Sequence, residues 1–323
     1  MSRKAELGRV VCLGEALVDL VCERPIASLP EADSFVARPG GSLANIAVCA
    51  ARFGANVEML GGVGDDEWGH WLRNCLMAEG VDVKRLKVIS SAWTSHAFVG
   101  VSHEGEPSFA FYGDGEPRLT RLDHGFDEIL DGPAGVLVVG SDTLVTEPDR
   151  GITLKAALKA GESGWSVLCD PNLRPNRWPD EPTMLAVVRA LVQASTLVKL
   201  NVNEALRLSG EADAEAAGEG LLRLGPEAAA ITLGADGALL TVRGSEPARV
   251  SGFEAQLVDS TGAGDSVTGT LAAAMAAGTA LGALAPALTA AMSAAAGVVS
   301  AWGAWEGLPT AARARSLLAS PPN

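Results

Sequence analysis

Short apolar segments alternate with longer segments of helical composition through the second half of the chain. Residues 136–140, 167–170, 196–200 and 229–233 are mostly apolar, and helical stretches separate them. Apolar runs of this length, separated by helices, are typical of buried strands in a parallel sheet with right-handed crossovers. The pattern therefore predicts an α/β fold built on a mostly parallel central sheet.

The first half of the chain begins with the same rhythm. Strands are expected at 9–13 and 57–60, and helices at 42–53 and 68–79. Asp19 follows the first strand closely, which predicts a place at the carboxyl edge of the sheet, where ligands bind in such folds. A solvated loop acid fits this segment equally well.

One region breaks the rhythm. Residues 97–102 and 108–112 alternate like paired strands around a turn at 103–107, with no helix between them. Together with the excursion at 21–36, they predict a small second sheet that projects from the main body.

Polar residues and glycines collect at the carboxyl ends of the later predicted strands. Open α/β sheets bind their ligands at this edge. The residues are Asp170, Asn172, Arg174, Asn201, Glu204, Thr232, Gly234 and Gly237.

A glycine-rich segment at 259–269 suggests a specific chemistry. It is expected to connect a strand ending near Val258 to a helix, so that the amides at 262–264 form an anion hole at the helix N-terminus. A carboxylate there would repel a phosphate unless it accepts a proton, so Asp265 is the candidate general base for phosphoryl transfer to a hydroxyl. By itself, this segment fits an ordinary turn with Asp265 as helix N-cap equally well.

Composition narrows the functional class. The net charge of −14 over 323 residues provides no basic field for nucleic acid or an anionic membrane. Five cysteines without a C-x-x-C pair are typical of reduced thiols in a cytoplasmic protein, and no signal peptide is expected. The uncharged stretch 266–305 is rich in Ala and Gly, which favours two buried helices over a membrane span.

Other nucleotide-binding classes fit less well. The glycine turn at 61–64 lacks the third glycine of a dinucleotide fingerprint, because Glu67 stands there, and no Walker motif occurs. A non-catalytic sugar-binding protein on the same scaffold stays open, although it would be expected to lose Asp265.

Five motifs occur together in the order and spacing of one known family. Segments 40–45 and 259–265 resemble the two signatures of the ribokinase family, also called PfkB carbohydrate kinases, and segments 62–66, 201–204 and 232–237 fall between them. The resemblance covers nearly the whole chain. It implies one kinase domain over 1–323, a ribokinase-like three-layer sandwich with a β lid formed from about 21–37 and 94–121.

The resemblance also implies roles for particular residues in an ATP-dependent sugar kinase. The base would be Asp265, with the anion hole at Gly262, Ala263 and Gly264. The sugar would be bound by Asp19, Gly40, Gly41, Asn45, Tyr112 and Arg174. The nucleotide side would comprise Lys199, Asn201, Glu204, Thr232, Gly234, Gly237 and Thr261, with Glu204 contacting Mg²⁺ through water.

Within the family, the segment 170–174 resembles fructokinases and 2-keto-3-deoxygluconate kinases. Ser42 replaces the lysine of ribokinases, which disfavours ribose. Arg174 could bind the carboxylate of a ketodeoxy acid, but the lid lacks the adjacent Tyr and Arg of acid-specific members, since Gly113 follows Tyr112. Fructose is therefore favoured, and 2-keto-3-deoxygluconate stays open. The resemblance further allows a K⁺ requirement and a homodimer joined through the lid.

Overall fold

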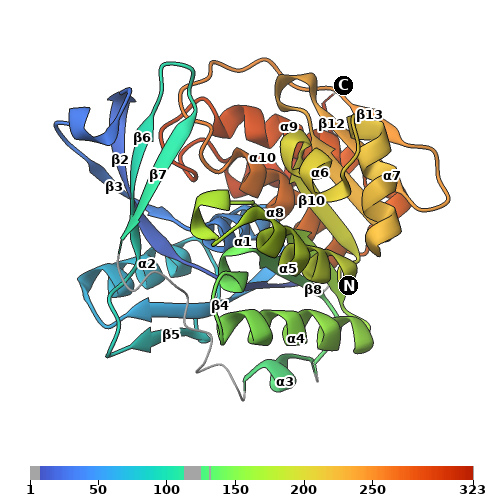
Figure 1. The fold of residues 1–323 in the computed structure, drawn as a ribbon, viewed down its shortest axis with the longest axis horizontal. Helices are drawn as coiled ribbons and strands as arrows, with labels where there is room; N and C mark the ends of the chain where they lie inside the picture. Colours follow the sequence, from blue (N-terminus) through green and yellow to red (C-terminus); the bar gives the residue numbers. More distant parts are fainter. Residues whose placement is uncertain (1–7, 113–124, 131, 323) are drawn as a thin grey trace, which may run out of the picture.

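A large, mostly parallel sheet forms the centre of the molecule (Figure 1), as predicted. The computed structural model describes residues 8–112, 125–130 and 132–322, and within them this sheet has nine strands in the order β13-β12-β11-β10-β9-β8-β1-β4-β5. Only the β11–β12 and β12–β13 pairs, at one edge of the described sheet, are antiparallel. The strands are β1 (Arg9–Leu13), β4 (Asn56–Gly64), β5 (Leu86–Ile89), β8 (Val136–Gly140), β9 (Ser166–Asp170), β10 (Leu197–Asn201), β11 (Ala228–Thr232), β12 (Ala238–Val242) and β13 (Ala248–Val250).

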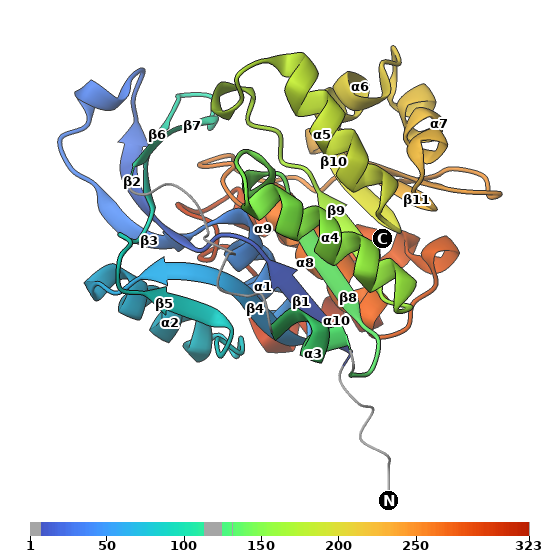
Figure 2. The same cartoon turned by 60° about the horizontal axis from the view of Figure 1, so that its bottom comes forward.

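Helices cover both faces of this sheet (Figure 2). Successive residues of β8 show why, because Val136 and Val138 pack into one hydrophobic cluster and Leu137 and Val139 into the other. The first cluster includes residues of α1 (Ser42–Arg52), α2 (Glu67–Ala78), α8 (Ala263–Ala276), α9 (Ala285–Val298) and α10 (Ala311–Ala319). The second includes residues of α3 (Gly125–Leu130), α4 (Asp149–Glu162), α5 (Glu181–Gln193), α6 (Val202–Ser209) and α7 (Ala214–Leu224).

A second sheet projects beside the first (Figure 1), in the order β3-β2-β6-β7. Its strands are β2 (Leu17–Pro25), β3 (Val36–Gly40), β6 (His96–Val101) and β7 (Pro107–Tyr112). The antiparallel pair β6–β7 was expected, whereas β2 begins earlier and β3 ends later than the expected lid segment 21–37. The expected continuation of the lid over 113–121 lies outside the described residues.

Asp19 follows the first strand and lines the cavity, as expected, but it lies within a strand of this second sheet and not at the end of the large sheet. The chain leaves β1 at Leu13 and resumes as β2 at Leu17, which makes Asp19 the third residue of a lid strand. Leu17 and Val21 pack into the lid's own hydrophobic cluster, and strand periodicity puts Asp19 on the same face.

Two glycine-based expectations also differ from the structure. The glycines at 61–64 lie within β4 and form no turn. A Cβ on Gly61 would stand 2.2 Å from the carbonyl oxygen of Gly14, the residue after β1. Close backbone approach explains that glycine. β13 ends at Val250, so no strand leads directly into α8.

The two alanine-rich helices expected at 266–305 are α8 and α9, and both are largely buried. Among the described residues, no helix has the length and apolar character needed to cross a bilayer. Helix α8 also packs tightly on α1. A Cβ on Gly269 would stand 2.6 Å from the Cβ of Cys49 and 2.8 Å from the carbonyl oxygen of Ile46.

Gly269→Ala is therefore expected to destabilise the protein. A helical Gly→Ala change normally stabilises by about 0.5–1 kcal/mol, but forcing α1 and α8 apart costs about 1–3 kcal/mol. Urea unfolding should show a lower free energy of unfolding. Gly161→Ala in α4, where a Cβ meets nothing within 4 Å, is the matched control and should be neutral or stabilising. Equal stability of the two variants would contradict the tight contact.

Candidate active site

A polar cavity of about 450 Å³ lies between the lid and the carboxyl edge of the large sheet. Leu17, Phe109 and Phe111 line it from the lid, and the other walls come from segments near the strand ends and from the N-termini of α1 and α8. It brings together most of the predicted site residues: Asp19, Gly41, Asn45, Arg174, Lys199, Asn201, Glu204, Thr232, Gly234, Thr261, Gly262, Ala263, Gly264 and Asp265.

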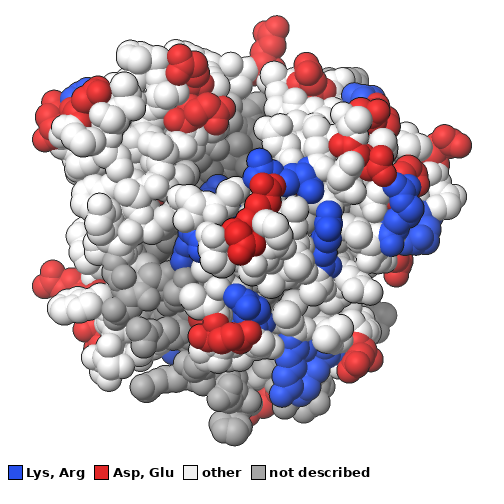
Figure 3. Space-filling view, in the orientation of Figure 1, with Lys and Arg blue, Asp and Glu red and all other residues white. Residues whose placement is uncertain are grey.

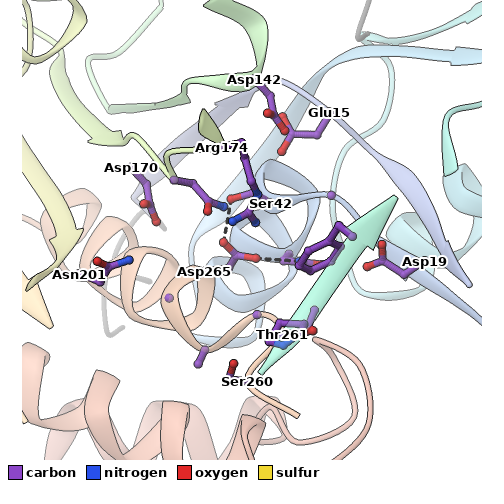
Figure 4. A pocket seen from close by; sticks show the side chains of 18 of the residues that line it. Glu15, Asp19, Ser42, Asp142, Asp170, Arg174, Asn201, Ser260, Thr261 and Asp265 are labelled. Atoms are coloured by element: carbon purple, nitrogen blue, oxygen red, sulfur yellow. Dashed lines mark hydrogen bonds between the residues drawn. The ribbon is translucent and has the colours of Figure 1, made fainter. Parts of the chain in front are cut away.

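Asp265 is the third residue of α8, and its carboxylate is held by two donors from α1 (Figure 4). Ser42 Oγ donates to Oδ1 at 2.7 Å, and Asn45 Nδ2 donates to Oδ2 at 2.8 Å. The N-cap is Gly262, in the left-handed region at φ 81°, so the alternative of Asp265 as an N-cap is wrong. Burial, together with the charge of Asp170, raises the pKa of Asp265, as suits a general base.

Two further side chains orient this acid. Trp305 Nε1 donates to Asn45 Oδ1 at 2.7 Å, which fixes the Asn45 amide so that its nitrogen faces Asp265. The sequence reasoning identified Asn45 but missed Ser42 and Trp305 as partners of Asp265. Ser42 stands inside the first signature and could have been found, whereas nothing in the sequence connects Trp305 to Asn45.

The amides at the start of α8 are only partly available. The Ala263 N–H donates to the Ser260 carbonyl at 3.2 Å, which removes Ala263 from the predicted anion hole. The amides of Gly262 and Gly264 have no acceptor among the described residues. They remain the candidates to bind an anion at this helix terminus.

A buried cation stands behind these amides. Lys199 Nζ is 2.7 Å from the position that a Cβ on Gly264 would occupy. Asp170 Oδ2 accepts hydrogen bonds from Lys199 Nζ at 3.1 Å and from Thr268 Oγ1 at 2.5 Å. Burial alone would lower the pKa of Lys199, but the carboxylates of Asp170 and Glu204 outweigh it and raise the pKa, so the ammonium stays charged.

Asn201 and Glu204 form a capping box at the start of α6. Asn201 Oδ1 accepts from the Glu204 amide at 3.0 Å, and Glu204 Oε2 accepts from the Asn201 amide at 3.0 Å. Glu204 Oε1 accepts from the Leu173 amide at 2.7 Å. Both carboxylate oxygens therefore already have a donor, which fits contact with a hydrated metal better than direct ligation.

Asp19 faces Asp265 from the lid (Figure 4). Burial, and secondarily the charges of Asp259 and Asp265, raise the pKa of Asp19 to about 7, and Arg174 opposes this rise. The Arg174 guanidinium lies 5.1 Å from the ring centroid of Phe109. Gly40 does not line the cavity, but a Cβ there would stand 2.0 Å from Asp19 Oδ2, so this glycine makes room for the acid.

Besides Gly40, the structure leaves two predicted residues outside the cavity. Tyr112 is 56% exposed and contacts Phe98 edge-on at 5.5 Å, on the lid face opposite Phe109 and Phe111, because side chains alternate along β7. Gly237, with φ 100°, packs against the backbone at Val250 and supports the neighbouring loop.

A second, more apolar cavity of about 970 Å³ adjoins the first. Phe253, Leu257, Val267, Met292 and Val299 supply apolar parts of its lining. The two cavities share Glu106 of the β6–β7 connection and lining residues at the α8 N-terminus and the β11 end, which are Thr232, Gly234, Ser260, Ala263 and Gly264. The sequence reasoning did not assign this apolar cleft, because its lining comes from alanine-rich helix and irregular loop.

Comparisons with known proteins agree with this geometry. The family model described as pfkB family carbohydrate kinase matches residues 8–311. The chain belongs to this family. It is therefore a carbohydrate kinase, a transferase, with a ribokinase-like fold.

Individual relatives of this pfkB family kinase include sugar kinases of known structure. It is 34% identical over 268 residues to fructokinase-2 of Solanum lycopersicum, covering 82% of this chain and 80% of that protein. It is similar to a double mutant of the fructokinase of Vibrio cholerae O395 bound to fructose, ADP and potassium ion, with TM-score 0.85, 29% identity, and 98% and 100% of the two chains covered. It is also similar to the aminoimidazole riboside kinase of Salmonella enterica complexed with aminoimidazole riboside and an ATP analogue, with TM-score 0.82, 28% identity, and 96% and 99% covered.

Asp19→Asn is expected to stabilise the unliganded kinase at high pH. Since the folded pKa of Asp19 is raised to about 7, the unfolded chain loses this proton first, and stability falls as pH rises from about 4 to about 7. The amide removes this loss, so the variant should match the wild type near pH 4 and exceed it by about 1–3 kcal/mol at pH 8.

Urea unfolding across this pH range measures the effect. Asp33→Asn is the control, because Arg24 lowers the pKa of this exposed carboxyl and the pH trend should be absent or opposite. An Asp19→Asn variant that differs from the wild type by the same amount at pH 4 and pH 8 would contradict the raised pKa.

Proposed function

We propose that this kinase is a fructokinase that transfers the γ-phosphate of MgATP to the primary hydroxyl of D-fructose, giving fructose 6-phosphate. One observation carries the proposal. The polar cavity and the apolar cleft meet at the N-terminus of α8, beside Asp265 and Gly264. A sugar in the first and a nucleotide in the second would bring the acceptor hydroxyl and the γ-phosphate together at this point.

In the proposed mechanism, Asp265 takes the proton of the attacking hydroxyl. Ser42 and Asn45 hold the carboxylate in place, and its raised pKa makes it a better base than an ordinary aspartate. The amides of Gly262 and Gly264, at the positive end of α8, would stabilise charge on the transferred phosphoryl group. Lys199, fixed by Asp170, adds a cation directly behind them.

The proposal includes two metal sites, one for Mg²⁺ and one for K⁺. Mg²⁺ would be held through water on the side of Asn201 and Glu204, where it would neutralise phosphate charge. K⁺ near the second signature stays a proposal; there Asp259 is fully buried and accepts from the amides of Thr261 and Gly303, each at 2.9 Å. The Vibrio cholerae relative was solved with potassium ion.

A 2-keto-3-deoxygluconate kinase is the second candidate. Arg174 lines the polar cavity and could pair with the carboxylate of such an acid. A non-catalytic sugar-binding protein is disfavoured, because Asp265 is buried, hydrogen-bonded and lines the polar cavity next to Gly264, which borders both cavities.

We also propose the lid-mediated homodimer and a cytoplasmic location. Aromatic residues gather on the lid face that points away from the cavity, where Phe35 and Phe98 lie 4.9 Å apart and Tyr112 adjoins them. Half-exposed aromatic side chains of this kind are enriched at protein interfaces.

The proposed location is supported by the surface charge. Acidic and basic side chains are interspersed over the face in Figure 3, and the net charge of −14 provides no basic field for an anionic membrane.

Asp265→Asn is expected to lower kcat by about 10²- to 10⁴-fold, the usual contribution of a general base, with sugar affinity nearly unchanged. Coupled ADP release with fructose, 2-keto-3-deoxygluconate, ribose and adenosine would measure activity and substrate choice together. Asp213→Asn is the control, because Asn caps the α7 N-terminus as well as Asp does. Near-normal turnover by Asp265→Asn would remove this residue from the role of base, and a preference for another substrate would overturn fructokinase activity.

A further inference from the structure

Two acids that the proposed phosphoryl transfer does not use lie at one end of the polar cavity. Glu15 follows β1, and Asp142 follows β8 in a short 3-10 helix, Asp142–Leu144. Because β1 and β8 pair in parallel, with Leu13 opposite Val139, their carboxyl ends bring the two acids together. Figure 4 shows the two carboxyl groups side by side, and Asp142 is the charged group with the largest effect on Glu15.

Glu15 has an oxygen without a partner. Its side chain is buried at 6% exposure, and Oε1 accepts from the Leu43 amide at 3.3 Å. Oε2 is buried and has no hydrogen-bond partner among the described residues. A buried polar atom in this state is costly unless something completes its hydrogen bonding, and Glu15 lines the cavity in which a sugar would lie.

The charges around the cavity favour a neutral ligand at this end. Arg177 already pairs with Asp142 at 3.1 Å, and Lys199 already pairs with Asp170 at 3.1 Å. Arg174 is therefore the lining cation, among the described residues, that is left for a ligand. A sugar carboxylate placed here would meet the like charge of Asp142, whereas sugar hydroxyls could form hydrogen bonds with the oxygens of both acids.

We propose that Glu15 and Asp142 act as a carboxyl pair that determines substrate class, binding hydroxyl groups of a neutral polyhydroxy sugar and excluding sugar acids. This inference rests on the proposed function and deepens it, because it separates fructose from 2-keto-3-deoxygluconate. Glu15 and Asp142 would contact the sugar without taking part in proton or phosphoryl transfer.

The protonation of the pair shapes the test. Burial, and then the charge of Asp142, raise the pKa of Glu15 to about 8, so Glu15 holds a proton near neutral pH. The pair then carries one negative charge. Glu15→Gln mimics the protonated acid and leaves Asp142 charged, while Asp142→Asn removes the charge that adds to burial in raising the Glu15 pKa. Removing the charge completely requires the double variant.

The experiment compares kcat/KM for D-fructose and 2-keto-3-deoxygluconate in the wild type, Glu15→Gln, Asp142→Asn and the double variant. In the double variant, kcat/KM for fructose should fall by about 10- to 100-fold, as expected for lost charge-assisted hydrogen bonds. The preference for fructose over the acid should fall at least about tenfold, with a smaller change in Glu15→Gln. The KM for MgATP should not move.

Controls separate specificity from structural damage. Glu162→Gln, an exposed acid at the end of α4, makes the same chemical change away from the cavity and should leave both substrates unaffected. Thermal unfolding checks that each variant is folded. If kcat/KM falls by the same factor for both substrates, or if the preference is unchanged in the double variant, the pair has only a structural role and the proposal is overturned.

A binding measurement keeps this inference distinct from the proposed function. Calorimetric titration of each sugar in the presence of a non-hydrolysable ATP analogue reports affinity without turnover. If the wild type phosphorylates neither sugar, fructokinase activity fails, and the pair is judged by binding alone. Tighter binding of fructose that weakens in the double variant supports the pair; tighter binding of the acid, or binding of neither sugar, overturns it.

Discussion

The site depends on one buried contact, the carboxylate of Asp265 on α8 held by the side chains of Ser42 and Asn45 on α1. It exists because small residues allow the two helices to approach until Gly269 lies against Cys49. Asp265 and Gly269 are one helical turn apart, as are Asn45 and Cys49, so tight packing and the hydrogen bonds occur on the same helix faces. An isolated carboxylate would be costly to bury here, and the two donors offset part of that cost.

Several acids that line the cavity are unfavourable in their charged form when no ligand is bound. The pKa values of Glu15, Asp19 and Asp265 are all raised, chiefly by burial and then by one another's charge or that of nearby acids. Only part of this negative charge is offset within the protein, where Lys199 pairs with Asp170 and Arg177 pairs with Asp142. Functional sites often carry such unfavourable charge, because the same groups become favourable when hydroxyl donors arrive.

Much of the architecture could be predicted from the chain, since buried parallel strands such as 136–140 have an unmistakable apolar pattern. The prediction failed at positions where the same residue type fits two different structural roles. Gly61 makes room for a neighbouring strand and forms no turn, and Asp19 lies within a lid strand because β2 follows β1 after only a short connection. Glu15 and Asp142 could have been found by the strand-end rule that identified Asp170. The contact of Trp305 with Asn45 could not, because it joins segments far apart in sequence.

The acids that face the cavity are divided between two sheets, with Asp19 on lid strand β2 and Asp265 on a helix packed against the large sheet. A ligand that hydrogen-bonds to both acids must contact the lid and the body of the kinase at once. Each such contact stabilises the position of the lid against the body. Ligand binding and the stability of the lid are therefore thermodynamically linked. The bound kinase should resist local opening of β2 more strongly than the empty one.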